Sequence, residues 1–481
     1  MPLILPGNVG SATAATTFSV ANSCMFNGSN SVMSVDTGSA STNKVTISAW
    51  VKKSAIATDQ WVVTSYRDNN NRAKFGFGGG DTLSYFMTEG GTDTEWNTTA
   101  LFRDPSAWYH ILLQADNTQG TFANRAKLYV NGVVMATSSS GSSTLNSATA
   151  IIGNGTTAVG DSFYGSAFQG NTVDGYLAEV VLVQGSILAP TAFGEFNADS
   201  GVWSAIDITD TVTGIADYSF YLDFEDSSNL GNNASDSGLA DLTEANLAAI
   251  DQKTDTCTNN FATLNPLVPS QGGFTPAAVA FAEGNLKFTT VNASSSYSRA
   301  NSTFLLSAGK WYVEIKYVNS GTIYGLVGIT GSNATTAAAY LGVYAYDYAW
   351  YGNGGFSGGD GNFYNNNGIV RQLGAGFDTN DIIGMAIDLD SGTKTIQYYR
   401  AGSAVGSANA IADPSATDFG GYAICASEWS NSTNAVFNFN FGNPAFAISS
   451  GNTDGNGYGN FEYAPPSGFL ALCTKNLAEN G

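Results

Sequence analysis

The sequence is poor in charged residues and in the side chains that carry most nucleophilic and metal chemistry. Only 12% of its 481 residues are Asp, Glu, Lys or Arg, about half the usual share. It contains a single histidine, His110, and four cysteines without a CxxC pair. A zinc ribbon and a dense disulfide framework are therefore excluded, and any histidine-based catalysis would depend on His110 alone. A lone histidine within an apolar strand is usually structural, which is the role we expect for it.

Basic residues are also scarce, and this restricts the partners. The chain has 18 Lys and Arg against 39 Asp and Glu, a formal net charge of −21. Nucleic acids and anionic membranes would repel such a surface, so we expect neither as a partner. No apolar run approaches the ~20 residues of a membrane span, and the first basic residue is Lys44. We therefore expect no membrane insertion and no secretory signal peptide. Polar neutral ligands such as glycans suit this composition.

Strand patterns dominate what the sequence does contain. Short runs of alternating apolar residues are separated by clusters of Gly, Ser, Asn and Asp, which is typical of β-sandwiches. One hairpin is especially clear, with Ile383, Met385, Ile387 and Leu389 on one side of a strand that ends in an Asp-Ser-Gly turn. The four cysteines are predicted to be buried thiols, with a bridge between Cys425 and Cys473 left as an alternative.

The clear hairpin lies in a segment that resembles a known family. Residues 381–402 read DIIGMAIDLDSGTKTIQYYRAG, and three further segments are KWYVEIKY (310–317), YGLVGIT (324–330) and VFNFNFG (436–442). In this order they resemble the SPRY domain over about residues 285–445. The sequence departs from that family at residues 398–402, where YYRAG replaces the usual Asn-Gly turn. The resemblance implies a β-sandwich that binds through its loops and has no catalytic residues.

Segments of the first half resemble a different sandwich. They are FNGSNSVMSV (26–35), VTISAWVK (45–52), residues 108–135 with the LYVNG turn, and DGYLAEVVLVQGSIL (174–188). Together they are similar to the laminin-G/concanavalin A-like jelly roll over roughly residues 18–225. Asn131-Gly132 in LYVNG predicts a type I′ hairpin turn.

These resemblances predict an all-β chain of two tandem antiparallel β-sandwiches, a jelly roll and then a SPRY-like fold, joined by an irregular connector. The expected divisions are an extended N-terminal segment (1–17), the jelly roll (18–245), the connector (246–284), and the SPRY-like sandwich with a C-terminal tail (285–481).

Catalytic and metal-binding patterns are weak. Glucanases of the concanavalin A-like fold carry paired carboxylates on one strand face, and the nearest pair here is Asp223 and Glu225. We interpret this pair as the end of a strand and a turn. A faint calcium-loop spacing over residues 93–104 has Thr98 where such a loop needs glycine. We therefore predict no enzyme activity, no catalytic residue, no metal and no cofactor.

The most suggestive binding segment is YLGVYAYDYAWYGNGG (340–355). Its alternating aromatic residues would share one face of a strand, and aromatic faces stack well on sugars. We expect Tyr344 and Tyr346 to be core residues and the rings near the following Gly/Asn-rich loop to be exposed. The candidate ligand-binding residues are Tyr348, Trp350, Tyr351, Phe363 and Tyr364.

A third resemblance covers nearly the whole chain. The opening MPLILPGN, the segment DTCTNNFATLNPL (255–267) and the tail PPSGFLALCTKNL (465–477) resemble tail-fibre or virion-surface proteins of marine and cyanobacterial bacteriophages. That resemblance implies a non-enzymatic tail-fibre or appendage subunit, made in the host cytoplasm and displayed on the phage particle. Its expected partners are other virion proteins and a host-surface glycan or protein, and its expected assembly is a homotrimer. Two alternatives stay open: a capsid-decorating or tail scaffold subunit that binds only virion proteins, and a polysaccharide depolymerase.

Overall fold

The chain folds into two compact units. The computed structural model describes residues 18–38, 42–147, 155–164, 167–267, 279–290, 296–322, 324–333, 340–354, 361–430 and 435–481. The N-terminal unit ends at Thr258 and the C-terminal unit begins at Asn259, a boundary inside the segment 246–284. The segment 1–17, expected to be extended, lies outside the described residues.

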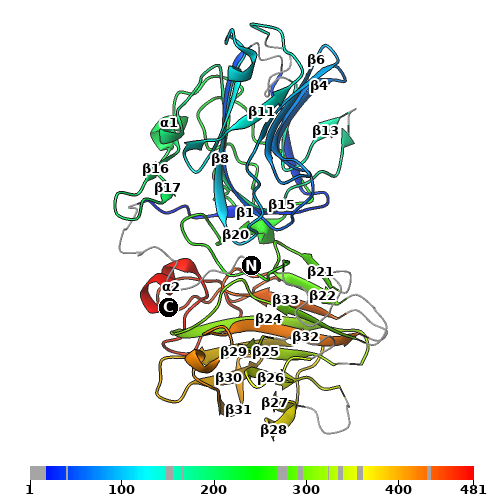
Figure 1. The fold of residues 1–481 in the computed structure, drawn as a ribbon, viewed down its shortest axis with the longest axis vertical. Helices are drawn as coiled ribbons and strands as arrows, with labels where there is room; N and C mark the ends of the chain where they lie inside the picture. The colour runs from blue at the N-terminus through cyan, green and yellow to red at the C-terminus, as the bar shows by residue number, and fades with distance from the viewer. Residues whose placement is uncertain are drawn as a thin grey trace. The chain divides into compact units, whose positions relative to one another are not determined.

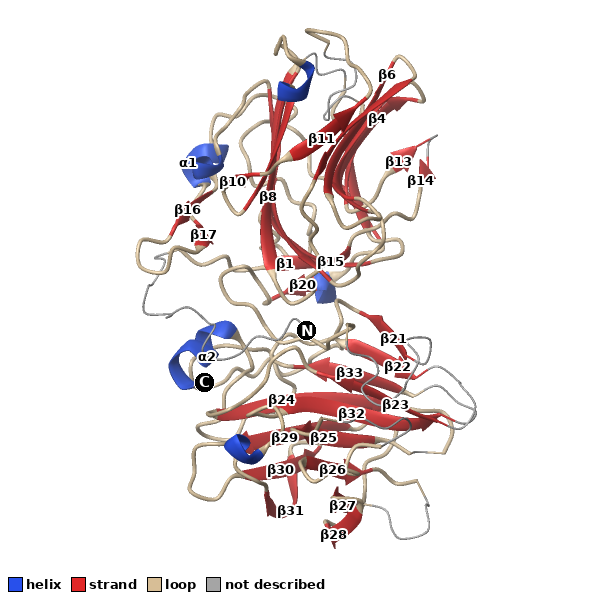
Figure 2. Ribbon diagram, viewed as in Figure 1, coloured by secondary structure: helices blue, strands red, loops and turns tan. Residues whose placement is uncertain are grey.

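Strands dominate both units, and the helices are short (Figure 2). Every strand pair named below is antiparallel, so the prediction of an all-β chain of antiparallel sandwiches is confirmed. No helix within the described ranges is long and apolar enough to cross a membrane.

The described part of the N-terminal unit is built around two eight-stranded sheets (Figure 1). The first sheet, in the order β10-β9-β8-β3-β15-β1-β20 with β18 paired to β15, contains β1 (Ser23–Asn27), β3 (Lys44–Lys53), β8 (Trp108–Asp116), β9 (Ala126–Val130), β10 (Val133–Val134), β15 (Asp174–Gln184), β18 (Phe220–Leu222) and β20 (Gln252–Lys253). The second, in the order β11-β7-β6-β5-β4-β12-β2-β19, contains β2 (Val32–Asp36), β4 (Gln60–Asp68), β5 (Asn71–Phe77), β6 (Leu83–Glu89), β7 (Thr92–Thr98), β11 (Thr137–Ser140), β12 (Thr156–Val159) and β19 (Thr243–Ala245).

Alternation along the strands places one apolar core between these sheets. On β3, the side chains of Val45, Ile47, Ala49 and Val51 enter the core that the two sheets share. The intervening residues of β3 point to the other side, where a layer of short elements covers the first sheet. That layer contains η3 (Pro190–Ala192), β16 (Gly194–Phe196), β17 (Trp203–Ala205) and α1 (Thr209–Val212).

The remaining short elements of this unit are η2 (Phe122–Asn124), the hairpin of β13 (Phe163–Tyr164) and β14 (Ala167–Phe168), and η4 (Ala249–Asp251). The expected type I′ turn between β9 and β10 is present. Asn131 and Gly132 have φ values of +47° and +75°, and Val130 pairs with Val133.

The described part of the C-terminal unit contains a seven-stranded and a six-stranded sheet. The first has the order β21 (Val279–Ala282), β22 (Lys287–Thr290), β33 (Val436–Asn440), β24 (Lys310–Val318), β29 (Ile382–Asp388), β30 (Thr395–Arg400) and β31 (Ser403–Ala410). The second has the order β23 (Ser296–Asn301), β32 (Ala423–Ser430), β25 (Leu326–Thr330), β26 (Asp347–Tyr351), β27 (Asn362–Asn365) and β28 (Gly368–Gln372). The helices within its described ranges are η6 (Pro414–Ala416) and α2 (Thr474–Asn480).

The hairpin that the sequence predicted is β29–β30. Met385 pairs with Tyr398 and Ile387 with Ile396, and all four side chains are fully buried in the core between the sheets. Asp388 closes the turn, because its carboxylate accepts hydrogen bonds from the backbone N–H groups of Asp390 and Ser391.

The segment between the predicted sandwiches is divided between the two units. β20 pairs with β1 in the N-terminal unit, whereas Leu264 is fully buried in the core of the C-terminal unit. All four cysteines are free thiols, which excludes a bridge between Cys425 and Cys473.

Candidate functional site

The second sheet of the N-terminal unit presents a polar face with half-buried aromatic rings. On β5, Ala73 and Phe75 enter the core, so Arg72 and Lys74 point to the opposite side. Lys74 pairs with Phe86 on β6 and with Thr64 on β4, and Arg72 pairs with Tyr66. We call this side of the sheet the β5 face, which comprises Thr64, Tyr66, Arg72, Lys74, Ser84 and Phe86.

Lys74 lies between two aromatic rings, those of Trp61 and of Phe86. Its Nζ is 4.4 Å from the ring centroid of Trp61 and 4.8 Å from that of Phe86. Burial lowers the pKa of Lys74 from its ordinary value, and Asp59 partly offsets this. Among the described residues, no carboxylate lies within ion-pair distance of this ammonium. The cation is thus held by rings, with no counter-ion from the part of the chain that the structure describes.

Arg72 extends the basic character of the β5 face toward the β13–β14 hairpin. Its guanidinium carbon is 4.7 Å from the ring centroid of Tyr164, and one Nη is 3.7 Å from Asp93. Tyr164 is 41% exposed and stands edge-on to Tyr66, with ring centroids 6.0 Å apart. Half-exposed rings and two cations therefore lie side by side on one surface.

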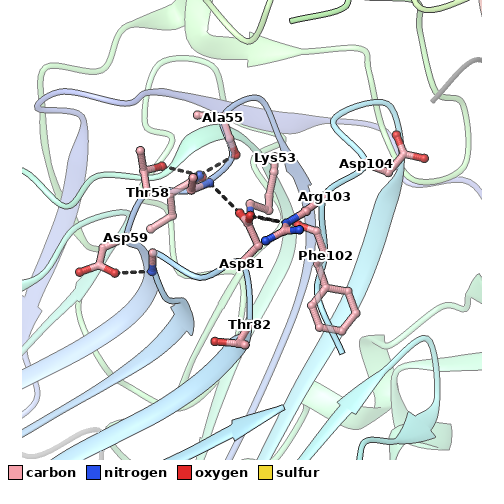
Figure 3. A network of polar contacts seen from close by, with 12 residues as sticks. Lys53, Ala55, Thr58, Asp59, Asp81, Thr82, Phe102, Arg103 and Asp104 are labelled. Atoms are coloured by element: carbon pink, nitrogen blue, oxygen red, sulfur yellow. Dashed lines mark hydrogen bonds and ion pairs between the residues drawn. The ribbon is translucent and has the colours of Figure 1, made fainter. Parts of the chain in front are cut away.

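Asp81 fixes the loops at one end of this sandwich (Figure 3). It has a φ of +62° and is only 1% exposed. Its carboxylate accepts hydrogen bonds at 2.9 Å from Lys53 Nζ, 2.9 Å from Arg103 Nε and 2.8 Å from the N–H of Ala57. Burial alone would raise the pKa of Asp81, but these donors lower it on balance. The Lys53 ammonium also donates to the carbonyl of Phe102, so a cation of the chain itself joins these loops.

The faint calcium spacing does not converge on a site. Asp93, Glu95 and Asn97 alternate along one side of β7, whereas Asp104 accepts hydrogen bonds from the N–H and hydroxyl of Ser106. Within the described ranges, no three His, Cys, Asp or Glu side chains are grouped in a way that could hold a metal ion.

A cavity of about 410 Å³ opens on the other side of the N-terminal unit, where the first sheet meets its covering layer. Glu179 lines it from a β-bulge in β15 with a φ of +52°, and accepts a hydrogen bond of 2.8 Å from the hydroxyl of Tyr221. Burial raises the pKa of Glu179 to about 7. Asp223 and Glu225 also line this cavity, and Asp223 accepts a hydrogen bond from the N–H of Glu225 after the end of β18.

His110 is a core residue. Its side chain is 0% exposed, its Nε2 is 2.8 Å from Ser48 Oγ, and its ring stacks on that of Trp203 with centroids 5.7 Å apart. Burial lowers its pKa to about 3, so the ring stays neutral at physiological pH. This environment fits the structural role expected for it.

The expected exposure of the aromatic candidates in the C-terminal unit is wrong for four of the five. Tyr348, Trp350 and Phe363 are 7%, 0% and 1% exposed and enter the core between the sheets. Tyr351 points to the other side and is 6% exposed. The physical reason is the register of β26 on β25, where Trp350 pairs with Val327 and Tyr348 with Ile329, and both partners face the core.

The two preceding tyrosines, Tyr344 and Tyr346, were expected in the core. Both lie in the turn before β26 and are half-buried, and Tyr346 packs against the core. Tyr364 is half-buried as well, and its role in binding stays a prediction. It belongs to a group of rings on the outer side of the six-stranded sheet that also contains Tyr297, Tyr340 and Trp429.

Sequence reasoning did not find the β5 face. Its residues come from three strands that are each ordinary when read alone, and they meet only through the register of β4, β5 and β6. The alternation in RAKFGF (72–77) and LSYFMTE (83–89) was the available indication, since it places Lys74 and Phe86 opposite core residues.

One comparison with known proteins agrees with the architecture of the N-terminal unit. Residues 27–187 match the family model Laminin_G_3, described as the concanavalin A-like lectin/glucanases superfamily. The N-terminal unit therefore contains a concanavalin A-like domain. No curated protein matches the chain.

Solved structures similar to this chain include SPRY and carbohydrate-binding domains. A human SPRY domain has 18% identity and a TM-score of 0.26, covering 34% of this chain and 94% of its own. A putative carbohydrate-binding protein from Bacteroides ovatus has 17% identity and a TM-score of 0.32, covering 47% of this chain and 58% of its own. The sialyllactose-bound CBM40 of the Ruminococcus gnavus IT-sialidase has 14% identity and a TM-score of 0.26, covering 31% of this chain and 80% of its own.

Proposed function

We propose that this chain is a non-enzymatic glycan-binding protein and that it binds through the β5 face of its N-terminal unit. The observation that carries the proposal is the arrangement on that face, where Phe86, Tyr66 and Tyr164 offer ring surface beside hydroxyl and cationic donors. The match of residues 27–187 to a lectin-type family supports it.

The chemistry of the face suits a sugar chain. Aromatic rings provide flat apolar surface for the C–H side of a sugar ring, and neighbouring polar groups hydrogen-bond to its hydroxyls. Arg72 and Lys74 supply such polar groups beside Tyr164 and Phe86. A face of this kind gives weak affinity for each sugar, and display of many copies multiplies it.

We extend this proposal to the surface of a bacteriophage particle. The resemblance of the opening, the segment 255–267 and the tail 465–477 to phage tail-fibre and virion-surface proteins supports this placement. In this proposal the chain is a homotrimeric fibre or appendage subunit that contacts other virion proteins and a host-surface glycan. A trimer would present three β5 faces to one cell surface.

Glycan binding by purified variants tests the proposal. Phe86→Ala removes the ring beside Lys74, and we expect at least a tenfold loss of affinity for any glycan that the intact chain binds on an array. The matched control is Phe196→Ala, which removes a 53% exposed ring from the layer over the other sheet. Equal binding by both variants would contradict the assignment to the β5 face. Absence of binding both to the array and to host cells would favour a scaffold role.

One observation favours a second candidate function, the hydrolysis of polysaccharide. Glu179 holds a proton near neutral pH in a cavity that Asp223 and Glu225 also line, and glycosidases pair a protonated carboxyl with an ionised one. Release of reducing ends from host capsule by the intact chain, abolished by Glu179→Gln, would establish this activity. Absence of release would dismiss it.

A further inference from the structure

We infer that the ligand of the β5 face is an acidic polysaccharide, whose sugar carboxylate binds the ammonium of Lys74. This inference rests on the proposed glycan binding and specifies the class of glycan. It is carried by a contrast between the charge of the whole chain and the charges that this face presents.

The cations on the β5 face stand out in a strongly acidic protein. The chain has a net charge of −21, yet two of its 18 basic residues, Arg72 and Lys74, occupy alternate positions on one side of β5. The Cα atoms of alternate strand residues are about 7 Å apart, so the two cationic groups can act on one ligand.

Lys74 differs from the buried Lys52 and Lys53 of the same unit, because no counter-ion for it lies among the described residues. Lys52 Nζ is 2.7 Å from Asp255, and Lys53 Nζ is 2.9 Å from Asp81. The ion pairs of the described chain include no such partner for Lys74, although its ammonium is partly buried between Trp61 and Phe86. Removing a cation from water without an anion is unfavourable, and an incoming carboxylate would reverse that cost.

The groups around Lys74 leave this position open to an anion. Asp59 and Asp93 act on Lys74 only through space, and Arg72 adds a like charge. Glu95 lies on the same side of the sheet, but it belongs to β7, two strands from β5. The backbones of β5 and β7 are about 10 Å apart. Since Phe86 pairs directly with Lys74, a sugar ring stacked on Phe86 would bring a ring carboxylate to the ammonium.

The expected contacts explain a preference for acidic sugars. The carboxylate of a uronic acid would accept charge-assisted hydrogen bonds from Lys74 Nζ and lie within the field of the Arg72 guanidinium. Such contacts are screened by salt, whereas stacking on Phe86 is not. Binding should therefore weaken as ionic strength rises, and the loss should be larger for acidic than for neutral sugars.

The test compares three polyuronates with their carboxyl-reduced counterparts, using the full-length chain and titration calorimetry. The probes are polygalacturonate, alginate and polyglucuronate. Lys74→Met removes the charge but keeps a flexible apolar stem between the rings, and Lys74→Arg restores a cation. The matched control is Lys127→Met, the same charge change at an exposed position on β9 of the first sheet.

We expect the intact chain to bind at least one polyuronate at least tenfold more tightly than its reduced form. Lys74→Met should abolish this preference, Lys74→Arg should restore most of it, and Lys127→Met should leave it unchanged. An unchanged melting temperature in Lys74→Met would exclude misfolding as the cause of the loss.

The two proposals fail in distinguishable ways. Equal binding of acidic and reduced polymers, sensitive to Phe86→Ala, would overturn the acidic-ligand inference and leave glycan binding standing. A preference that Lys74→Met does not change would also overturn it. Binding of no glycan on the array and no polymer of either form would overturn both proposals.

Discussion

The stability of the C-terminal unit should fall as pH rises from about 5 to 9, because Glu428 is buried without a cation. Glu428 on β32 is 1% exposed and accepts hydrogen bonds of 2.9 Å from the hydroxyl of Tyr317 and 2.9 Å from the N–H of Tyr324. No ion pair of the described chain includes it. Burial raises its pKa from 4.5 to about 8, more than the hydrogen bonds lower it.

The direction of the effect follows from proton binding in the two states. The folded chain keeps the Glu428 proton up to about pH 8, whereas the unfolded chain releases it near 4.5. Its contribution to stability is therefore complete below about pH 4.5 and is lost as pH rises through about 8. Each pH unit between the two pKa values corresponds to about 1.4 kcal/mol, so the total loss is on the order of 5 kcal/mol.

Glu428→Gln isolates this contribution. The glutamine amide retains an acceptor for Tyr324 and carries no charge at any pH, so we expect the stability of the variant to fall less between pH 5 and 9. Urea unfolding of the C-terminal unit at each pH measures the difference. Glu314, whose pKa burial raises to about 7, contributes equally to both proteins and cancels. The control is Glu479→Gln at an exposed site, and identical pH profiles for Glu428→Gln and the wild type would refute the reasoning.

Two further substitutions test the packing of each unit. Trp350→Ala empties a fully buried site in the C-terminal core and should reduce the free energy of unfolding by about 3–5 kcal/mol, measured in urea, with glycan affinity unchanged. A normal stability with weakened binding would instead place Trp350 in a site. Asp255→Asn leaves the buried Lys52 ammonium, 2.7 Å from this carboxylate, without its counter-ion and should cost about 3–5 kcal/mol in the N-terminal unit. A melting temperature that changes by less than a degree would show that the pair carries little stability.

The fold could be predicted from local patterns that agree with the tertiary structure. Met385 and Ile387 alternate with polar or small residues and lie in the core because the hairpin is fixed by its own turn. Asn131-Gly132 specifies a turn that few other dipeptides adopt. Such features are encoded within a few residues, so they are readable without the rest of the chain.

The site was less predictable, because the side of a strand that faces inward depends on its pairing with neighbouring strands. The aromatic run around Trp350 has the alternation of a strand, but the ring faces the core because Trp350 pairs with the buried Val327 of β25. The reverse holds for Lys74, which is unremarkable in sequence and gains its environment from Trp61 on β4 and Phe86 on β6. A surface assembled from neighbouring strands becomes visible only once their register is known.

Hydrogen–deuterium exchange of the full-length chain, with and without a saturating glycan that it binds, tests the central claim most directly. Backbone amides of β5 and β6, around Lys74 and Phe86, should exchange more slowly in the presence of the glycan. The first sheet of the same unit serves as an internal reference and should be unaffected. Protection confined to the C-terminal unit, or to the cavity lined by Glu179, would contradict the assignment of glycan binding to the β5 face.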